Sequence, residues 1–396
     1  MSAAPPADDS HWARRVAPLA VVAASGAAVV YLPQPIQTLV ADEFDGGVAA
    51  AAIPPVVVLV GYAFGLVVFV SIGDRLSPRA QVSAQLVATA CAVGAAALAP
   101  AFGGYVVACL VAGAAASYGQ IIIATALRSV APDARARVVA VILGAFMIGM
   151  FAMRTGLGAL AGVLGWRAVL LGIAIVILAL VIPALLALPH DQRTSPPGVL
   201  RVIRSLPAVA LRSPALVLMT AVHAAAFASF ITAWAVSTIV AVEEIGLDVS
   251  SAALLGLAGV AAGGIAIGVA RAHRRVGAPR SIAIALSALV AGALLFAVAG
   301  TWLPTLAIAL FLLSLGLITS QVTTQAEALA SVGPAEAGRA NTVYTSITFL
   351  LGAGMTWLGG ALVHEVGFWA VGVLIAALGL LALALTLVAR RRGVIA

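Results

Sequence analysis

Three ionisable side chains interrupt long apolar stretches of this sequence: Arg154, His223 and Glu327. Such groups usually serve a function, because burying one in lipid is costly. Arg154 could bind an anionic group of a substrate or pair with backbone carbonyls, or its side chain could extend to the lipid headgroups. His223, which titrates near neutral pH, and Glu327 are the candidates for carrying a proton. The structural alternatives are a hydrogen bond from His223 to a neighbouring helix and a salt bridge from Glu327 to Arg128 or Arg339.

Uncharged polar and aromatic side chains gather in a few of the apolar stretches and are candidates to line a substrate cavity. Gln321 and Gln325 are four residues apart and therefore share one face of a helix, and Gln120 is expected at a comparable depth. Hydrogen bonding between helices is the competing explanation for these polar side chains. Together with Arg154 and His223, the candidates for the cavity are Tyr31, Gln34, Gln37, Tyr118, Gln120, Trp234, Gln321 and Gln325.

The composition places these residues in a membrane protein. Hydrophobic residues make up 63% and charged residues 9% of the 396 residues, whereas soluble proteins have roughly 45–50% and 25%. The net charge of +7 does not indicate nucleic-acid binding, because the sequence has no lysine and its arginines form short clusters between apolar stretches, where they contact anionic lipid. Cys91 and Cys109 lie within apolar stretches and fit neither a metal site nor a disulfide. We expect no metal and no cofactor.

The apolar stretches predict an all-α membrane protein. A transmembrane helix needs about 20 mostly apolar residues, and twelve stretches meet this requirement. They are residues 16–41, 48–72, 80–99, 102–128, 136–162, 167–189, 214–241, 249–271, 281–300, 303–329, 337–362 and 367–389. Polar residues are concentrated in spans one, four, seven and ten, which we expect to line a water-filled path. Spans six, nine and twelve are expected to face lipid.

The distribution of arginine predicts how the chain is oriented. With the N-terminus inside, every arginine except Arg154 and Arg167 lies on the cytoplasmic side, as the positive-inside rule requires. Both termini are then cytoplasmic. The predicted organisation is a tail (1–15), a six-helix bundle (16–189), a linker (190–213), a second six-helix bundle (214–389) and a tail (390–396). Residues 199–206 of the linker favour a short interfacial helix, with an irregular linker as the alternative.

Two segments of the chain repeat each other in type and spacing. The matching pairs are each separated by 202 residues, and they are Pro132 and Pro334, Arg137 and Arg339, Gly165 and Gly367, and Ala168 and Ala370. This separation is close to half of the chain length. It therefore indicates two similar halves, as in many membrane transporters.

The loop between predicted spans two and three carries a resemblance to a known family. Residues 73–79 read Gly-Asp-Arg-Leu-Ser-Pro-Arg and resemble the signature loop of the major facilitator superfamily, with Ser77 and Pro78 in place of a glycine and a basic residue. Segments 31–35, 61–65, 154–156 and 338–342 resemble a bacterial efflux-type branch of that family. The resemblance implies two pseudo-symmetric six-helix bundles. It also implies a gate formed by Asp74, Arg75 and Arg79, in which Asp74 caps the N-terminus of span eleven when the cytoplasmic side is closed.

Some residues depart from the proton-coupled drug antiporters of this family. Cys109 lies where many of them have an arginine in span four, and span five contains Arg154-Thr155-Gly156 in place of their glycine-proline pattern. Proton coupling is therefore implied by the branch and not by these residues.

These observations together predict a secondary transporter of the bacterial inner membrane. It works by alternating access and exports a small organic solute or drug in exchange for protons. The alternatives are a facilitator or uptake symporter of a small metabolite and, from another class, a non-transporting membrane sensor or scaffold. No His, Asp or Glu cluster with catalytic spacing occurs, so the sequence does not predict an enzyme. The expected partners are the solute, protons and membrane lipids, without nucleic acid, and we expect a monomer.

Overall fold

The computed structural model describes residues 9–73, 76–129, 135–190, 199–273, 277–299, 302–333 and 336–395, and these residues contain helices but no strand. The first half of the chain forms α1 (Asp9–Tyr31), η1 (Gln34–Ile36), α2 (Gln37–Glu43), α3 (Gly47–Ala51), α4 (Ile53–Gly73), α5 (Pro78–Ala97), α6 (Phe102–Ala115), α7 (Tyr118–Ser129), α8 (Arg135–Leu164), α9 (Trp166–Ala179) and α10 (Val181–Ala187). The second half forms α12 (Pro214–Ile239), η2 (Val240–Glu244), α13 (Val249–Ala253), α14 (Gly256–His273), α15 (Ala278–Ala299), α16 (Leu303–Ala330), α17 (Ala337–Glu365) and α18 (Phe368–Arg391). Between the halves lies α11 (Val199–Arg212).

The twelve predicted spans correspond to these helices. Among the described residues, 11 helical segments are long and apolar enough to cross a membrane. Residues 16–31 and 34–43 form two helical segments with a bend between them, and counted together as one span they make the twelfth. The bend of 42° follows from Pro33 and Pro35, which cannot donate the backbone hydrogen bonds of a continuous helix. The fold is therefore the predicted all-α membrane fold of two six-helix bundles.

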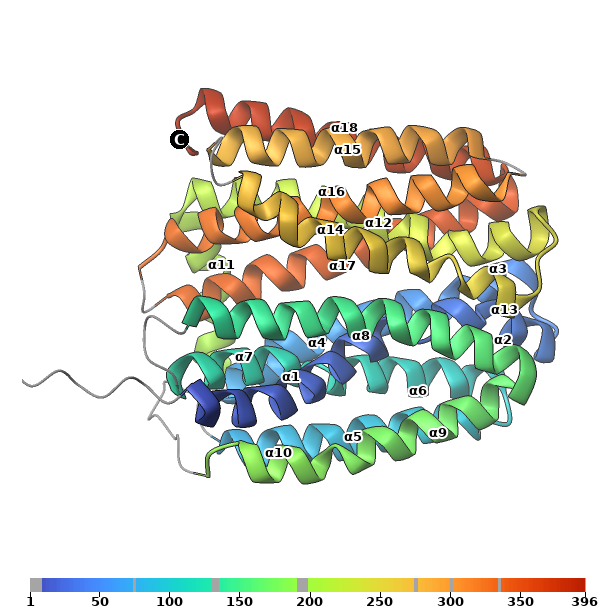
Figure 1. The fold of residues 1–396 in the computed structure, drawn as a ribbon, viewed down its shortest axis with the longest axis horizontal. Helices are drawn as coiled ribbons and strands as arrows, with labels where there is room; N and C mark the ends of the chain where they lie inside the picture. Colours follow the sequence, from blue (N-terminus) through green and yellow to red (C-terminus); the bar gives the residue numbers. More distant parts are fainter. Residues whose placement is uncertain are drawn as a thin grey trace, which may run out of the picture.

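The two halves lie side by side along their whole length (Figure 1). We call the end that carries the C-terminus and the start of α1 the terminal end, and the opposite end, which carries α2, α3 and α13, the distal end. Helices α5, α9, α10, α15 and α18 form the outer layers, away from the seam between the halves (Figure 1). Spans six, nine and twelve are thus peripheral. Helix α12 is central, since every residue from Val222 to Ile239 is buried.

The repeat in the sequence appears as a repeat in backbone conformation. Gly165 precedes α9 with φ of 81°, and Gly367 precedes α18 with φ of 107°. Glycine adopts positive φ without steric penalty, so each half makes the same sharp turn at the same point. The long helix before each turn is also alike, with 30 residues in α8 and 29 in α17.

Local contacts explain features of the chain that the family resemblance does not. Ser77 accepts a hydrogen bond from the Ala80 amide at 3.2 Å, and Pro78 is the first residue of α5. Serine at the N-cap and proline at the first helical position both favour helix initiation. Ser77 and Pro78, which depart from the signature loop, therefore favour the start of α5 at this point. Span four contains an unexpected break between α6 and α7, where the Gln85 amide donates to the Ala115 carbonyl at 3.1 Å.

Candidate functional site

A cavity of about 500 Å³ lies on the seam between the two halves. Its lining extends to Leu329, the second-last residue of α16, and to Asn341 in the second turn of α17, so the cavity occupies the terminal half of the seam. The described side chains that line it come from α1, α4, α7, α8, α12, α16 and α17. They are Ala27, Val30, Tyr31, Tyr62, Gln120, Ile123, Ala124, Phe146, Met147, Met150, His223, Phe227, Phe230, Leu317, Ile318, Gln321, Val322, Gln325, Ala326, Leu329, Asn341, Tyr344, Thr345, Thr348 and Phe349.

Five of the predicted cavity residues line this space: Tyr31, Gln120, His223, Gln321 and Gln325. The four spans that were expected to line a path, one, four, seven and ten, all contribute. Spans two and eleven contribute as well, without any predicted cavity residue. Span five contributes through Phe146, Met147 and Met150 and not through Arg154, its predicted cavity residue.

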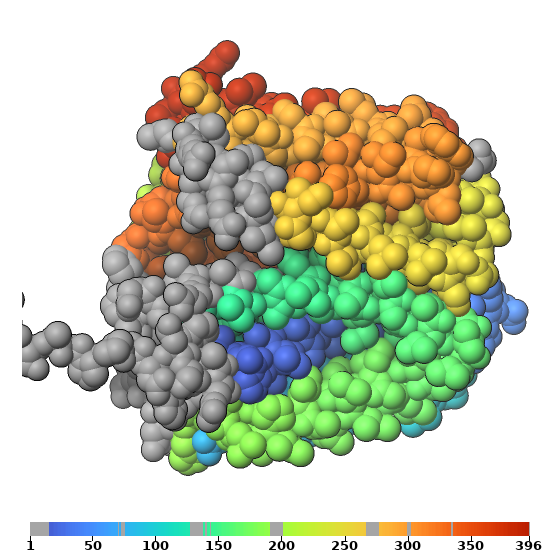
Figure 2. All heavy atoms as spheres, viewed as in Figure 1, coloured from blue at the N-terminus to red at the C-terminus, as the bar shows by residue number. Residues whose placement is uncertain are grey.

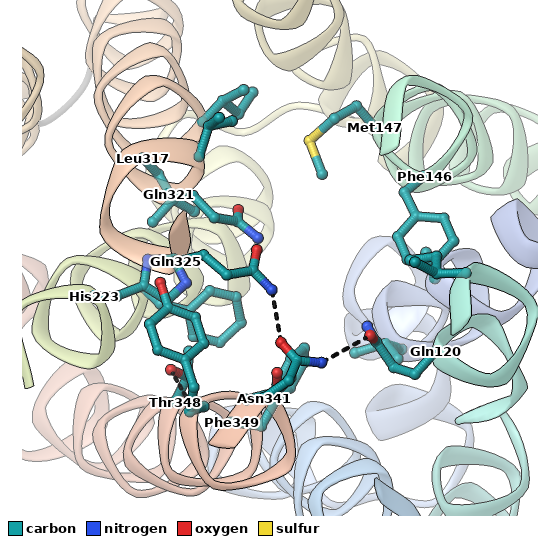
Figure 3. A pocket seen from close by; sticks show the side chains of 18 of the residues that line it. Gln120, Phe146, Met147, His223, Leu317, Gln321, Gln325, Asn341, Thr348 and Phe349 are labelled. Carbon is teal, nitrogen blue, oxygen red and sulfur yellow. Dashed lines mark hydrogen bonds between the residues drawn. The ribbon is translucent and has the colours of Figure 1, made fainter. Parts of the chain in front are cut away.

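Asparagine 341 links the glutamines of the two halves (Figure 3). The Gln325 amide donates to the Asn341 side-chain oxygen at 2.8 Å, and the Asn341 amide donates to the Gln120 side-chain oxygen at 3.4 Å. The Gln120 side chain also lies close to the Tyr62 hydroxyl. Helix α7 belongs to the first half and α16 and α17 to the second, so this chain of amides crosses the seam inside the cavity.

His223 lies at the wall of the cavity on α12. Its ring stacks on the Tyr344 ring, with 5.0 Å between centroids and an angle of 8° between the planes. Its Nδ1 atom is buried and makes no hydrogen bond to another described residue. The Tyr344 hydroxyl in turn contacts the Thr324 hydroxyl at 3.0 Å. The imidazole is therefore positioned at the cavity wall by ring stacking, with its Nδ1 atom left without a partner among the described residues.

Arg154 lies outside the cavity lining and seals the seam on its distal side. Counting from the start of α8 at ~1.5 Å per residue places it about 28 Å along that helix. Its Nη1 atom donates to the Gln34 side-chain oxygen at 2.6 Å, within the first half. Its Nη2 atom reaches α12 of the second half, with the Trp234 carbonyl at 3.0 Å, the Ser237 hydroxyl at 3.0 Å and the Thr238 hydroxyl at 2.8 Å. The guanidinium also lies 4.7 Å from the centroid of the Trp234 ring.

This Arg154 network contains no carboxylate among the described residues, and the arginine is only 3% exposed. A buried cation needs its donors satisfied, because desolvating it costs several kcal/mol. Neutral oxygens accept hydrogen bonds from both Nη atoms, whereas the Nε atom has no partner among the described residues. The acceptors on α12 are available to Arg154 only when the halves meet. The Gln37 amide adds a further contact across the seam by donating to the Ala235 carbonyl at 2.5 Å.

Small residues let the backbones approach on the same distal side. A Cβ atom at Gly158 would lie 2.5 Å from the Ala253 Cβ, and one at Gly360 would lie 2.3 Å from the Ala52 Cβ. Both contacts join one half to the other. Figure 2 shows α8 in green packed directly beside the yellow α13 and α14 at this end. The distal seam is therefore closed by close packing as well as by Arg154.

The remaining predicted residues lie elsewhere. Tyr118 packs within the first half, where its hydroxyl contacts the Ser25 hydroxyl at 2.7 Å. Glu327 is half-buried and does not line the cavity. The predicted salt bridge from Glu327 to Arg339 is absent from the described contacts, since Arg339 approaches Glu336 at 3.6 Å instead; the Arg128 side chain lies outside the described residues.

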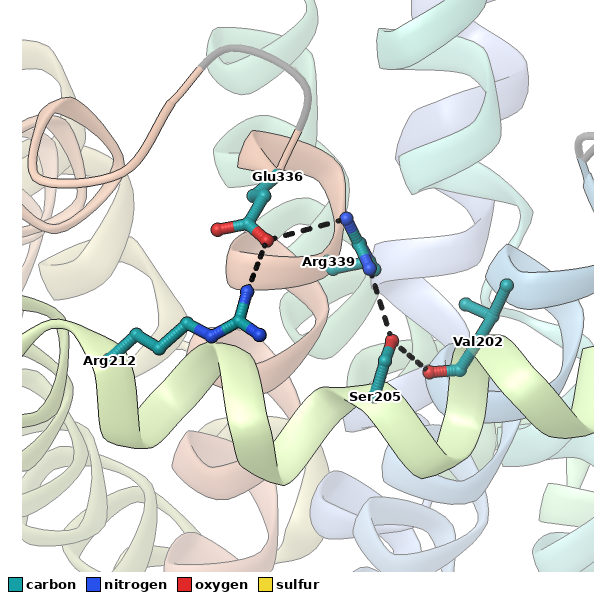
Figure 4. A network of polar contacts seen from close by, with 5 residues as sticks. All are labelled: Val202, Ser205, Arg212, Glu336 and Arg339. Atoms are coloured by element: carbon teal, nitrogen blue, oxygen red, sulfur yellow. Dashed lines mark hydrogen bonds and ion pairs between the residues drawn. The ribbon is translucent and has the colours of Figure 1, made fainter. Parts of the chain in front are cut away.

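The predicted gate is described only in part. Asp74 and Arg75 lie outside the described residues. The Arg79 side chain donates to the Leu188 carbonyl at 2.9 Å, within the first half. The start of α17, which was expected to receive Asp74, is contacted here by the linker helix (Figure 4). Arg212 of α11 pairs with Glu336 at 3.2 Å, and Arg339 donates to the Ser205 hydroxyl at 3.3 Å.

Several lining residues were missed by sequence reasoning, above all Tyr62, Asn341 and Tyr344. A signal for the α17 residues existed, because Asn341, Thr345 and Thr348 follow the i, i+4, i+7 spacing of one helix face. Tyr62 has no polar neighbour at helical spacing among the apolar residues around it in α4. The sequence therefore does not distinguish it from an aromatic residue of the core.

A membrane-spanning helical chain with a cavity on the seam between two similar halves has the architecture of a secondary transporter. The sequence profile of the Major Facilitator Superfamily matches residues 19–356. The probable transporter SCO4007 of Streptomyces coelicolor is 32% identical over 365 residues, which are 91% of this chain and 83% of that protein. The chain therefore belongs to the Major Facilitator Superfamily and is a multi-pass membrane transporter of small molecules.

Other similar proteins agree with this family. The putative uncharacterized transporter YgaY of Escherichia coli is 29% identical over 164 residues, or 41% of each chain. The solved structure of the nucleoside transporter NupG is similar with a TM-score of 0.74 at 13% identity, covering 93% of this chain and 98% of that one. The human organic anion transporter MFSD10 gives a TM-score of 0.69 at 20% identity, covering 97% and 100%. At these identities the two structures establish the fold alone.

Proposed function

We propose that this transporter exports a small organic solute from a bacterial cell in exchange for protons, with both termini in the cytoplasm. The observation that carries the proposal is a cavity shared by both halves at the terminal end, together with a closed seam at the distal end. The arginine-rich terminal end faces the cytoplasm under the positive-inside rule. In an exporter, this state receives solute from inside the cell. The direction of export itself rests on the resemblance of segments 31–35, 61–65, 154–156 and 338–342 to the efflux-type branch.

The proposed mechanism is alternating access, in which residues 16–189 and 214–389 rock against each other as units. The linker (190–213) and the two tails (1–15 and 390–396) lie on the cytoplasmic side. When the distal seam opens, the Arg154 guanidinium leaves its acceptors on α12 and becomes hydrated. Water then replaces the lost hydrogen bonds, so the network contributes far less than the sum of its contacts. A gate of this kind holds the seam closed and still opens within a transport cycle.

The terminal end requires a second gate for the outward-facing state. We assign this role to Asp74, with Arg75 and Arg79, at the N-terminus of α17. A carboxylate at the positive end of a helix is stabilising by up to ~2 kcal/mol in a partly buried geometry. Glu336 and Arg339 already place charges at this helix start, and Arg212 of the linker joins them in the present state.

His223 is the proposed proton carrier. It is the histidine among the lining residues, and the lining contains no Asp or Glu in the part of the chain that the structure describes. A proton on His223 would place a positive charge beside the solute in an otherwise uncharged cavity. Protonation would thereby weaken the binding of a cationic solute or change the affinity of a neutral one, which couples the two fluxes.

Transport by the purified chain in liposomes tests the proposal. A pH gradient, acidic on the side that corresponds to the cell exterior, should drive solute uptake into inside-out vesicles, and a pH-sensitive dye should report proton movement with it. Downhill solute flux without proton movement would indicate a facilitator, and co-directional flux an uptake symporter. A folded protein that moves none of a broad solute panel would favour the membrane sensor.

A further inference from the structure

The polar side chains of the cavity are carboxamides, hydroxyls and one imidazole among the described residues. Its lining contains four carboxamides, Gln120, Gln321, Gln325 and Asn341, and no Asp, Glu, Lys or Arg among the described residues. A charged solute would lose its hydration here without gaining a fixed counter-ion, which is unfavourable in a buried site. An uncharged solute meets no such penalty.

The carboxamides are joined so that hydrogen-bonding capacity is left over. A carboxamide offers two N–H donors and an oxygen with two lone pairs. In the chain from Gln325 through Asn341 to Gln120, each link uses one donor and one lone pair. Gln321 lies one helical turn before Gln325, and its side chain makes no hydrogen bond to another described residue. The cavity therefore presents donors and acceptors side by side.

The contact that crosses the seam is the weak link of this chain. The Asn341 amide lies 3.4 Å from the Gln120 oxygen, beyond the usual range of 2.7–3.2 Å for an N–H···O hydrogen bond. The Gln325 to Asn341 contact, inside the second half, is 2.8 Å. A ligand with its own donor and acceptor can therefore replace the long contact with two shorter ones, one to each half.

Aromatic rings flank the carboxamides. The Tyr62 ring of the first half lies 4.6 Å from the Phe349 ring of the second half, measured between centroids, and Phe349 lies 4.8 Å from Phe227. Tyr62 also touches Gln120. Ring faces beside paired donors and acceptors suit a flat body with a polar edge.

We infer that the solute is an uncharged, planar aromatic compound with an N–H donor beside a hydrogen-bond acceptor, as in a primary carboxamide, a lactam or a nucleobase edge, and that it bridges Gln120 and Asn341. Asn and Gln side chains recognise such edges by paired hydrogen bonds. The inference rests on the proposed function in so far as the cavity is the solute site. It also assigns a consequence to binding, since a ligand held by both halves favours the state in which they are close.

The test uses matched ligands on the purified full-length chain in lipid nanodiscs, with binding measured by calorimetric titration. One arm compares naphthamide, N,N-dimethylnaphthamide and naphthoate. The second arm compares 9-methyladenine with N6,N6,9-trimethyladenine, in both of which N9 carries no hydrogen, and so separates carboxamides from nucleobases. Methylation removes the donor and keeps the ring, and naphthoate replaces the carboxamide by a charge. In at least one arm, the ligand with the unmethylated nitrogen donor should bind about tenfold more tightly than its methylated partner. The methylated ligand has no donor for the buried Gln120 oxygen, and leaving such a group unpaired is costly.

Variants connect this preference to the proposed residues. Gln120→Leu and Asn341→Leu should each abolish the discrimination between the two partners. Gln81→Leu is the matched control, because Gln81 donates to the Phe69 carbonyl within the first half and lies outside the cavity. This variant should show the same ratio of affinities for the two partners as the unaltered chain. If a variant does not fold, the comparison of ligands on the unaltered chain still tests the substrate class.

The outcomes separate this inference from the proposed function. Equal affinity for methylated and unmethylated partners, preference for naphthoate, or no binding in either arm overturns the substrate class, even if the protein exports other solutes. Discrimination that depends on Gln120 and Asn341 supports the class, even if liposomes show no proton-coupled export.

Discussion

The Arg154 guanidinium donates a hydrogen bond to the Thr238 hydroxyl at 2.8 Å, and this contact joins α8 of the first half to α12 of the second. Its two companions on α12 are the Trp234 carbonyl and the Ser237 hydroxyl. All three acceptors are lost to Arg154 if the halves separate at the distal end. Removing a single acceptor atom on α12 should therefore destabilise the closed distal end.

Thr238→Val should open the distal seam, because it removes an acceptor from a buried cation and preserves the side-chain shape. A hydrogen bond to a charged group contributes about 1.5–3 kcal/mol, so the open fraction should rise by at least about tenfold. The measurement is the rate of maleimide labelling of Ser250→Cys, at a seam position where the serine hydroxyl donates to the Ala159 carbonyl at 3.1 Å. Cys91 and Cys109 are replaced by alanine in this background.

Thr232→Val is the control for this prediction. Thr232 lies on the same helix and is fully buried, but its hydroxyl makes no hydrogen bond to another described residue. Its replacement should leave the labelling rate unchanged. Equal rates for the Thr238 and Thr232 variants would remove Arg154 from the gate.

Gly158→Ala should also hold the distal end open, for a steric reason. The added Cβ would lie 2.5 Å from the Ala253 Cβ, closer than two such atoms tolerate, and overpacking typically costs about 1–3 kcal/mol. Spin labels attached through Asp42→Cys and Glu365→Cys, at exposed distal positions of the two halves, should report a longer mean distance. Gly156→Ala, two residues earlier, meets nothing within 4 Å and should leave that distance as it is. A shift in both variants would point to helix propensity and not to the seam.

Much of the fold was predictable because its signals are local. Runs of about 20 apolar residues set the spans, and the repeat at Gly165 and Gly367 marks a turn that needs positive φ in each half. The bend in span one followed from Pro33 and Pro35. The break in span four was not predicted. The Ala115 carbonyl at the break accepts a hydrogen bond from Gln85 of another helix, and no signal in span four itself indicates that partner.

The candidate site was predictable by residue type but not by place. Gln120, Gln321 and Gln325 do face a common cavity, as the depth of each in its helix implied. Gln34, Gln37, Arg154 and Trp234 share their polarity and their central position, yet they close the seam. In the proposed alternating-access mechanism, whether a polar residue lines a cavity or closes a seam depends on which end of the transporter is open. That is a property of the conformation and not of the sequence around each residue.

Glu336→Gln should have only a small effect on stability. Its ion pair with Arg212 is 3.2 Å long, with side chains 27% and 70% exposed, and such surface pairs contribute at most about 1 kcal/mol. The midpoint of thermal unfolding should therefore fall by about one degree or less at low salt and converge on that of the unaltered chain at high salt, where the pair is screened. Glu365→Gln, which breaks the exposed contact with His364, serves as the matched control. A large loss that persists in high salt would mean that Glu336 has a structural role beyond this pair.

His223→Asn should uncouple protons from solute. Asparagine keeps hydrogen-bonding capacity at the cavity wall but cannot titrate, so solute-driven proton flux should fall to the level of empty liposomes. Exchange of labelled for unlabelled solute, which needs no net proton movement, should continue. The stacked contact with Tyr344 at 5.0 Å is lost as well, so a lower affinity for solute is expected in the same variant.

His364→Asn provides the control, because His364 is exposed and pairs with Glu365 at the distal end. If proton flux survives in His223→Asn and disappears in Glu327→Gln, the carrier is the carboxylate of α16, and the proton path runs beside the cavity instead of through it.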